Sequence, residues 1–121
     1  MKVCVTSQGA DLNAQVDPRF GRCRYFILVD TDTLEFESLD NLAISASGGA
    51  GIQAGQFIAD KGVKIVLTGN VGPNAFSVLS AAGIEVFTGV NGIVNEVVEK
   101  YKNGEYNSSD GPSVDSHFGS K

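Results

Sequence analysis

The fold is decided by one stretch of the sequence, VKIVLTGNVGPNAFSVLSAAG, residues 63–83. Its apolar and β-branched start predicts a buried strand, and the glycines that follow predict a turn. Pro73 suits the first position of a helix, whose apolar side chains recur at helical spacing until Gly83 ends it. A strand, a turn and a helix in this order indicate one step of a parallel α/β sheet.

The same pattern extends outward on both sides of this stretch. The other elements expected are strands at residues 3–6, 25–29, 34–39 and 84–87 and helices at residues 51–61 and 93–101. A turn at residues 31–33 joins two of the strands into an antiparallel hairpin, whereas the later crossovers make parallel strands. The order βββαβαβα therefore predicts an α/β fold with a mixed five-stranded sheet.

Length and composition indicate one folded domain with a tail. The chain has 121 residues, 42% of them hydrophobic and 19% charged, which suits a single packed core. We expect a domain at residues 1–103 and a flexible tail at residues 104–121, because Gly, Ser, Asn and Asp dominate after Gly104. No apolar run is long enough to cross a bilayer, and no signal peptide precedes the first strand. We expect a cytoplasmic protein that does not associate with membranes.

Several glycine-containing loops are predicted to meet at one edge of the sheet. In an open α/β sheet, loops at the carboxyl ends of the strands bind ligands, and the free N–H groups of helix N-termini favour anions. The candidate binding residues in these loops are Gly49, Gly51, Gly69, Asn70 and Gly72. A long loop over residues 7–22 is expected to leave the first strand at the same edge.

All three arginines of the chain, Arg19, Arg22 and Arg24, lie in or just after this long loop, around Cys23. Their positive charge predicts that the Cys23 thiolate is favoured, which is the form that binds metals. A buried cysteine at the start of a strand is the alternative interpretation. The formal net charge of −5 weighs against broad binding of nucleic acids.

Other chemistries lack the residues they need. His117 is the single histidine and lies in the tail, so the folded body holds no Ser-His-Asp or Cys-His arrangement. A site with four protein ligands cannot be built from one accessible cysteine, so any metal must bring other ligands with it. We therefore expect a binding protein and not an enzyme.

Two segments carry a resemblance to a known family. Residues 16–23, VDPRFGRC, followed by Tyr25 and Phe26, resemble the signature loop of the dinitrogenase iron-molybdenum cofactor biosynthesis family, and residues 68–75, TGNVGPNA, are also similar to it. The resemblance covers roughly residues 1–103. It implies a ribonuclease H-like, three-layer α/β/α fold and a carrier of nitrogenase cofactor or its iron-sulfur precursors, with cluster donor and acceptor proteins as partners. It also adds Phe20 and Gly21 to the candidate site.

The first hypothesis is noncatalytic binding of an anionic iron-sulfur or iron-molybdenum-sulfur cluster by Cys23, the arginines and backbone amides. Many relatives have His where this chain has Arg19. The tail sequence VDSHFG, residues 114–119, matches VDPRFG, residues 16–21, at four of six places, so His117 is a second candidate metal ligand. The alternative hypothesis is metal-free binding of a phosphate or carboxylate at the same edge.

Overall fold

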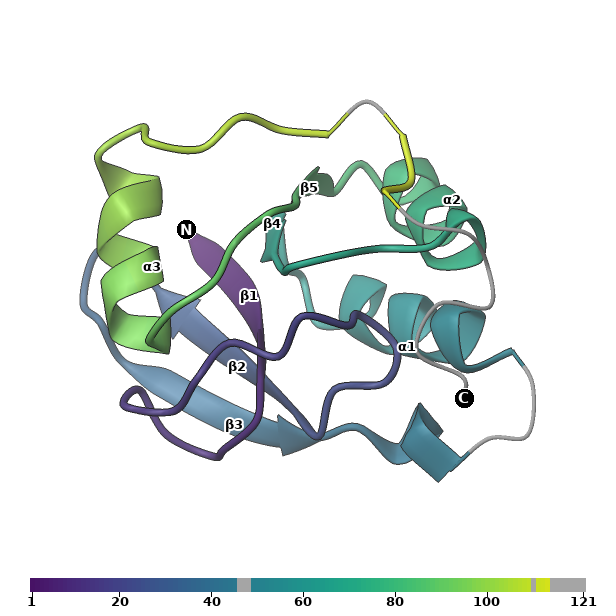
Figure 1. The fold of residues 1–121 in the computed structure, drawn as a ribbon, viewed down its shortest axis with the longest axis horizontal. Helices are drawn as coiled ribbons and strands as arrows, with labels where there is room; N and C mark the ends of the chain where they lie inside the picture. The colour runs from purple at the N-terminus through teal and green to yellow at the C-terminus, as the bar shows by residue number, and fades with distance from the viewer. Residues whose placement is uncertain (46–48, 110, 114–121) are drawn as a thin grey trace.

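The structure is a computed structural model that describes residues 1–45, 49–109 and 111–113. Its elements, in chain order, are β1 (Lys2–Ser7), β2 (Tyr25–Asp30), β3 (Phe36–Asp40), the 3-10 helix η1 (Leu42–Ser45), α1 (Ala50–Ala59), β4 (Ile65–Leu67), α2 (Pro73–Ala81), β5 (Glu85–Phe87) and α3 (Val94–Lys102). The predicted order βββαβαβα is confirmed, with η1 added between β3 and α1 (Figure 1).

The five strands form one mixed sheet in the order β3-β2-β1-β4-β5. β1 pairs antiparallel with β2, and β2 pairs antiparallel with β3, as expected of the hairpin. On the other side, β1 pairs parallel with β4 and β4 pairs parallel with β5. β1 is thus the central strand, where the antiparallel and parallel halves of the sheet meet.

Helices cover both faces of the sheet, which gives the predicted three layers. α1 and α2 lie on one face, where Ala54, Ile58 and Leu79 pack in the cluster that contains Cys4 of β1. α3 lies on the other face, where its buried valines pack in the cluster that contains Val3 and Val5. Successive side chains of β1 alternate between these clusters because a strand points them to opposite faces.

β3 begins two residues later than predicted because a tight turn precedes it. The Asp30 carboxylate oxygen Oδ1 accepts hydrogen bonds from the backbone N–H groups of Asp32 at 2.8 Å and Thr33 at 3.2 Å. Leu34 then adopts a left-handed conformation with φ of 63°, and its N–H donates to the Asp30 carbonyl at 2.8 Å. A residue in this conformation cannot continue a strand, so the pairing starts at Phe36.

The chain after α3 differs from the expected tail as far as Ser109. Ser108 forms a β-bridge with Phe87, and the Ser109 N–H donates to the Val86 carbonyl at 2.7 Å. Tyr106 packs against the cluster on the α3 side. β5 is an edge strand of the sheet, and its outer backbone groups explain why a polar segment binds there. Residues 114–121, with His117, lie outside the described residues.

In the part of the chain that the structure describes, no helix is both long enough and apolar enough to cross a membrane.

Candidate functional site

The site is built on residues 16–24, which we call the signature loop. This loop is the later part of the connection from the carboxyl end of β1 to the start of β2, and three neighbouring segments hold its backbone. Val16 N–H donates to the Gly92 carbonyl at 2.8 Å, Asp17 N–H to the Thr6 carbonyl at 2.9 Å, and Phe20 N–H to the Asn70 carbonyl at 3.1 Å. The predicted meeting of loops at the carboxyl edge is therefore present, but the loops meet along the signature loop and not at Cys23 alone.

Two threonines reinforce this attachment. The Thr6 hydroxyl donates to the Asp17 carbonyl at 2.7 Å and lies 2.8 Å from the Thr68 hydroxyl oxygen. Thr6 and Thr68 are fully buried. They tie the ends of β1 and β4 to the start of the signature loop, and sequence analysis did not single them out.

Two of the predicted ligand-binding glycines have a packing role. A Cβ atom on Gly69 would lie 2.6 Å from the Pro18 Cα atom, closer than real Cβ contacts come. Gly21 has a φ of +97°, and a Cβ atom there would lie 3.3 Å from the Gly51 Cα atom. Both glycines allow the signature loop to lie directly on the neighbouring backbone.

The remaining loop residues mark the starts of two helices. Gly49 precedes α1 in a left-handed conformation with φ of 72°, and Gly72 precedes α2 in an extended one. The N–H groups of the first turns of α1 and α2 thus begin at the edge that the signature loop crosses, as the sequence predicted. Gly51 is half-buried and lies in the first turn of α1, against Ala75 of α2.

Phe20 anchors the middle of the signature loop in the core. Its ring centroid lies 5.5 Å from that of Phe26, and the side chain is buried among residues of α1 and α2. Phe20 was a candidate for binding the ligand, and the structure places it in the hydrophobic core beneath the edge.

Cys23 is fully buried, and the expectation of an arginine-favoured thiolate is wrong for this structure. Burial, and second the negative charge of Asp17, raise the pKa of the Cys23 thiol far above its ordinary value. Backbone hydrogen bonds act in the opposite direction but do not offset burial. The alternative interpretation, a buried cysteine at the start of a strand, describes its environment. A protonated thiol in the core does not fit the role of an accessible metal ligand.

Asn41, directly after β3, closes the signature loop over Cys23. Its side-chain amide donates to the Cys23 carbonyl at 2.9 Å and to the Gly21 carbonyl at 3.1 Å, and it lies 3.9 Å from the Cys23 sulfur. Its side-chain oxygen accepts from the Ala43 N–H at 3.1 Å. Sequence analysis missed Asn41. The available signal was a polar side chain at the carboxyl end of a strand, on the edge already identified.

The arginines keep positive charge at this edge, each in a different setting. Arg19 Nε lies 3.5 Å from Asp17 Oδ1, and the Arg19 side chain remains 40% exposed whereas that of Asp17 is 6% exposed. The Arg24 guanidinium lies 5.6 Å from the Tyr25 ring centroid and is exposed. Arg22 is half-buried. Arg19 is thus fixed by an ion pair while part of its surface faces solvent, an arrangement suited to contacting an anion.

Among the described residues, no three His, Cys, Asp or Glu side chains come together in a way that could hold a metal ion. The residues at this edge fit recognition of an anion by arginine and backbone N–H groups better than they fit a protein-built metal centre.

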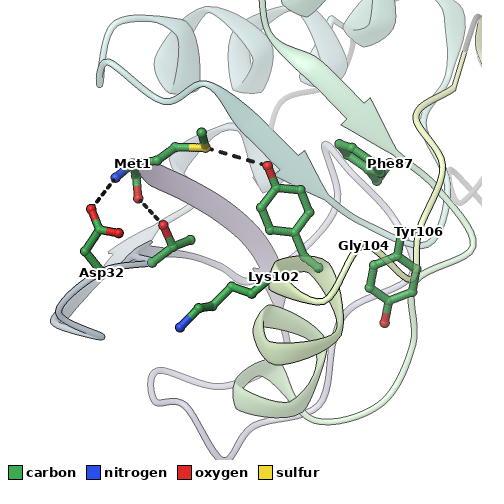
Figure 2. A pocket seen from close by; sticks show the side chains of 8 residues that line it. Met1, Asp32, Phe87, Lys102, Gly104 and Tyr106 are labelled. Carbon is green, nitrogen blue, oxygen red and sulfur yellow. Dashed lines mark hydrogen bonds and ion pairs between the residues drawn. The ribbon is translucent and has the colours of Figure 1, made fainter.

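A separate pocket of about 450 Å³ contains none of the predicted site residues (Figure 2). Its lining includes Phe87 and Tyr101, whose ring centroids lie 5.4 Å apart, and Tyr106. Met1 and Asp32 also line it, and the N-terminal amine of Met1 forms an ion pair with Asp32 at 3.4 Å. The pocket lies near the amino end of β1, away from the signature loop at its carboxyl end.

Comparison with known proteins shows the same fold in several solved structures. The apo form of the orange protein from Desulfovibrio gigas is 41% identical and superimposes with a TM-score of 0.90 over 93% of this chain and 96% of that one. An NMR structure of a putative NifB protein from Thermotoga is 36% identical, with a TM-score of 0.77 over 88% and 91% of the two chains.

Sequence comparisons agree with this likeness. An uncharacterized protein of Methanocaldococcus jannaschii is 30% identical over 96 residues, which make up 77% of this chain and 81% of that protein. The family model described as dinitrogenase iron-molybdenum cofactor matches residues 1–104, which include the whole signature loop. The chain therefore belongs to the dinitrogenase iron-molybdenum cofactor family.

Proposed function

We propose that this protein binds an anionic iron-sulfur or iron-molybdenum-sulfur cluster without catalysing a reaction, and carries it between donor and acceptor proteins. Family membership supports a cofactor-related role. The observation that carries the proposal is the fixed and partly exposed position of Arg19 on a signature loop whose backbone is held by Thr6, Asn70 and Gly92. Such an edge presents positive charge without reorganisation when an anion arrives.

The arginines and the backbone N–H groups of the edge would make the first contact with the cluster. An anionic cluster supplies most of its own ligands, so Arg19, Arg22 and Arg24 would hold it by neutralising its negative charge. The glycines keep the backbone close to the edge. Cys23 lies below this surface, so any bond between its sulfur and a metal would require the signature loop to open first.

The test is anaerobic reconstitution of the full chain with iron and sulfide, or with isolated iron-molybdenum cofactor, followed by gel filtration and a visible spectrum. We expect Arg19→Gln to lower cluster retention severalfold. Lys64→Gln removes an exposed positive charge elsewhere and should retain as much cluster as the unchanged protein. Equal retention by all three proteins would refute the role of the arginine edge.

A second candidate function is metal-free binding of a phosphate or carboxylate at the same edge. The burial of Cys23 favours it, because the described residues then offer arginines and amides but no accessible thiolate. Metal analysis of protein purified without oxygen separates the two functions. Substoichiometric iron and molybdenum, together with thermal stabilisation by a phosphate ester, would support this candidate over the cluster carrier.

A further inference from the structure

The two edge strands of the sheet differ in what pairs with their outer sides. Along β5, the segment after α3 supplies partners: Ser108 forms a bridge with Phe87, and the Ser109 N–H donates to the Val86 carbonyl at 2.7 Å. At the opposite edge, β3 pairs with β2, and within the described residues no other strand or bridge pairs with it (Figure 1). β3 is therefore an open edge, which is a template for pairing with another strand.

The pairing with β2 shows which backbone groups of β3 point to the open side. The Asp30 N–H donates to the Glu35 carbonyl at 2.9 Å, and the Asn41 N–H donates to the Arg24 carbonyl at 3.0 Å. In an antiparallel ladder, residues bonded to the neighbouring strand alternate with residues whose N–H and C=O groups point away from it. The odd-numbered residues from 35 to 41 thus face β2. The residues whose backbone groups point to the open side are Phe36, Ser38 and Asp40.

Exposed apolar side chains gather along the same edge. Phe36 is 44% exposed, Leu34 just before β3 is 38% exposed, and Leu42 just after it is 81% exposed. Elsewhere in the described part of the chain, the large hydrophobic side chains with comparable exposure are those of Met1 and Ile52. Apolar groups that gather at one edge, and are not scattered singly, indicate a surface that another chain covers.

The acidic side chains lie on the other face of this strand. Glu35 and Glu37 are exposed, and among the described residues no ion pair holds either carboxylate. Because successive residues of a strand point to opposite faces, these carboxylates lie on one face and Phe36 lies on the other. A second copy of β3 would bring the carboxylates of both copies together, which destabilises a strand pair, whereas a basic segment is attracted.

We propose that β3 docks an extended segment of a partner protein in which basic and apolar side chains alternate. The segment adds a further strand to the sheet and bonds to the outward backbone groups of β3. Its basic side chains face Glu35 and Glu37, and its apolar side chains pack on Phe36. β3 runs directly into Asn41, whose side chain holds the signature loop, so the docked segment lies beside the proposed site. That the partner is a cluster donor or acceptor rests on the proposed function, whereas the docking itself does not.

The probe for this docking is a short capped peptide in which lysine alternates with valine. It is titrated into the isotope-labelled full chain at low ionic strength, and amide hydrogen exchange is followed by NMR. We expect exchange to slow severalfold at the outward amides of Phe36, Ser38 and Asp40, because these N–H groups gain partners. Equal slowing of exposed amides over the whole chain, or no slowing at millimolar peptide, would overturn the proposal.

Protein variants separate the strand pairing from simple charge attraction. Ser38→Pro removes an N–H group that points away from β2, and proline is tolerated at such positions of an edge strand. We expect it to abolish peptide binding with little change in melting temperature. Glu37→Gln should weaken binding severalfold, whereas Glu105→Gln, which removes an exposed carboxylate elsewhere, should not. Unchanged binding by Ser38→Pro would overturn the proposal.

Modified peptides give the same test without changing the protein. One peptide is N-methylated at its valines and another at its lysines, so that one of the two lacks the N–H groups that would face β3. At least one of them should fail to slow exchange, and equal binding by both would overturn the strand pairing. Slowing of the same amides at high protein concentration without peptide would show pairing with a second copy, and would also overturn the proposal. None of these measurements uses a cluster, so they decide the docking whether or not the reconstituted protein retains iron.

Discussion

The two cysteines are both completely buried, but different parts of the structure bury them. Cys4 lies in the central strand β1 with its side chain packed in the cluster formed with α1 and α2, so this helix layer would have to leave the sheet before the thiol met water. Cys23 lies under the signature loop, which is held by side-chain hydrogen bonds from Asn41 and by close contacts with glycines. Local opening of one loop would expose Cys23, whereas exposure of Cys4 requires global unfolding.

The pKa values of the two thiols are both raised by burial, but the second cause differs between them. Burial raises the pKa of Cys4 well above its ordinary value, with a smaller contribution from Cys23. Burial also raises the pKa of Cys23, and the next cause is the Asp17 carboxylate of the signature loop itself. The pKa of Cys23 therefore depends in part on the loop that carries the proposed ligand contacts, whereas that of Cys4 depends mainly on its burial between the sheet and the helices α1 and α2.

The largest effect is expected from Asn41→Ala, which removes the side chain that closes the loop over Cys23. Three buried or half-buried backbone groups lose their partner. At about 1 kcal/mol for each lost hydrogen bond, the free energy of unfolding should fall by about 3 kcal/mol. Urea unfolding measures this loss, with the exposed Asn95→Ala as a control that should change it little.

The same variant should make Cys23 react faster with a thiol reagent while Cys4 stays unreactive below the unfolding transition. Peptide mapping after labelling distinguishes the two thiols. If labelling of both cysteines became faster to the same degree, the protein would open as one unit. Cys23 would then not be exposed by local opening of the signature loop.

Gly69→Ala should also displace the signature loop, because Gly69 lies directly against Pro18 of that loop. The added Cβ atom would lie 2.6 Å from the Pro18 Cα atom, so the loop must shift. Overpacking of this kind costs roughly 1–3 kcal/mol. Calorimetry should show a lower melting temperature, whereas Gly111→Ala, where an added Cβ meets open space, should unfold as the unchanged protein does.

High pH should weaken the folded state through both cysteines. A thiol whose pKa is raised by folding stabilises the folded state below the pKa of the unfolded chain, and this contribution falls as the pH rises above it. As the pH rises above about 8.5, the loss caused by each buried thiol should approach a limit of about 1.4 kcal/mol of unfolding free energy per pH unit. Urea unfolding between pH 8 and 10 measures the slope.

Cys23→Ala separates the two contributions to that slope. The variant should lose the part that belongs to Cys23 and retain that of Cys4. An unchanged slope would mean that the Cys23 thiol titrates in the folded protein as it does in the unfolded chain, which would contradict the closed signature loop.

The smallest effect is expected from ending the chain after Asn103. Loss of the flexible tail expected from the sequence would leave stability almost unchanged, but the structure shows Ser109 hydrogen-bonded to Val86 and Tyr106 packed against the α3 side. The free energy of unfolding should fall by about 1–2 kcal/mol. The change should leave the labelling rate of Cys4 low, since β5 lies two strands away from β1. No measurable loss would support the expectation of a flexible tail at residues 104–121.

Local patterns predicted most of the fold because each element carries its own signal. The apolar, β-branched run of β1, the turn at residues 31–33 and the Pro73 helix start depend on near neighbours in the chain, and all are present in the structure. The position of β3 was wrong by two residues, since the left-handed conformation of Leu34 has no clear sequence signature. Division of the chain at Asn103 remains a prediction.

We could predict the element order, the edge at which the loops meet and the presence of arginines there, because these follow from short-range periodicity and from strand direction. Contacts between segments distant in the chain bury Cys23, place Phe20 in the core and bring Asn41 over the loop, and local patterns did not reveal them. Neighbouring charges in the sequence suggested a thiolate, but the pKa of a thiol depends on solvent access and on groups distant in the chain. Those are set when the signature loop, β3 and α1 pack together.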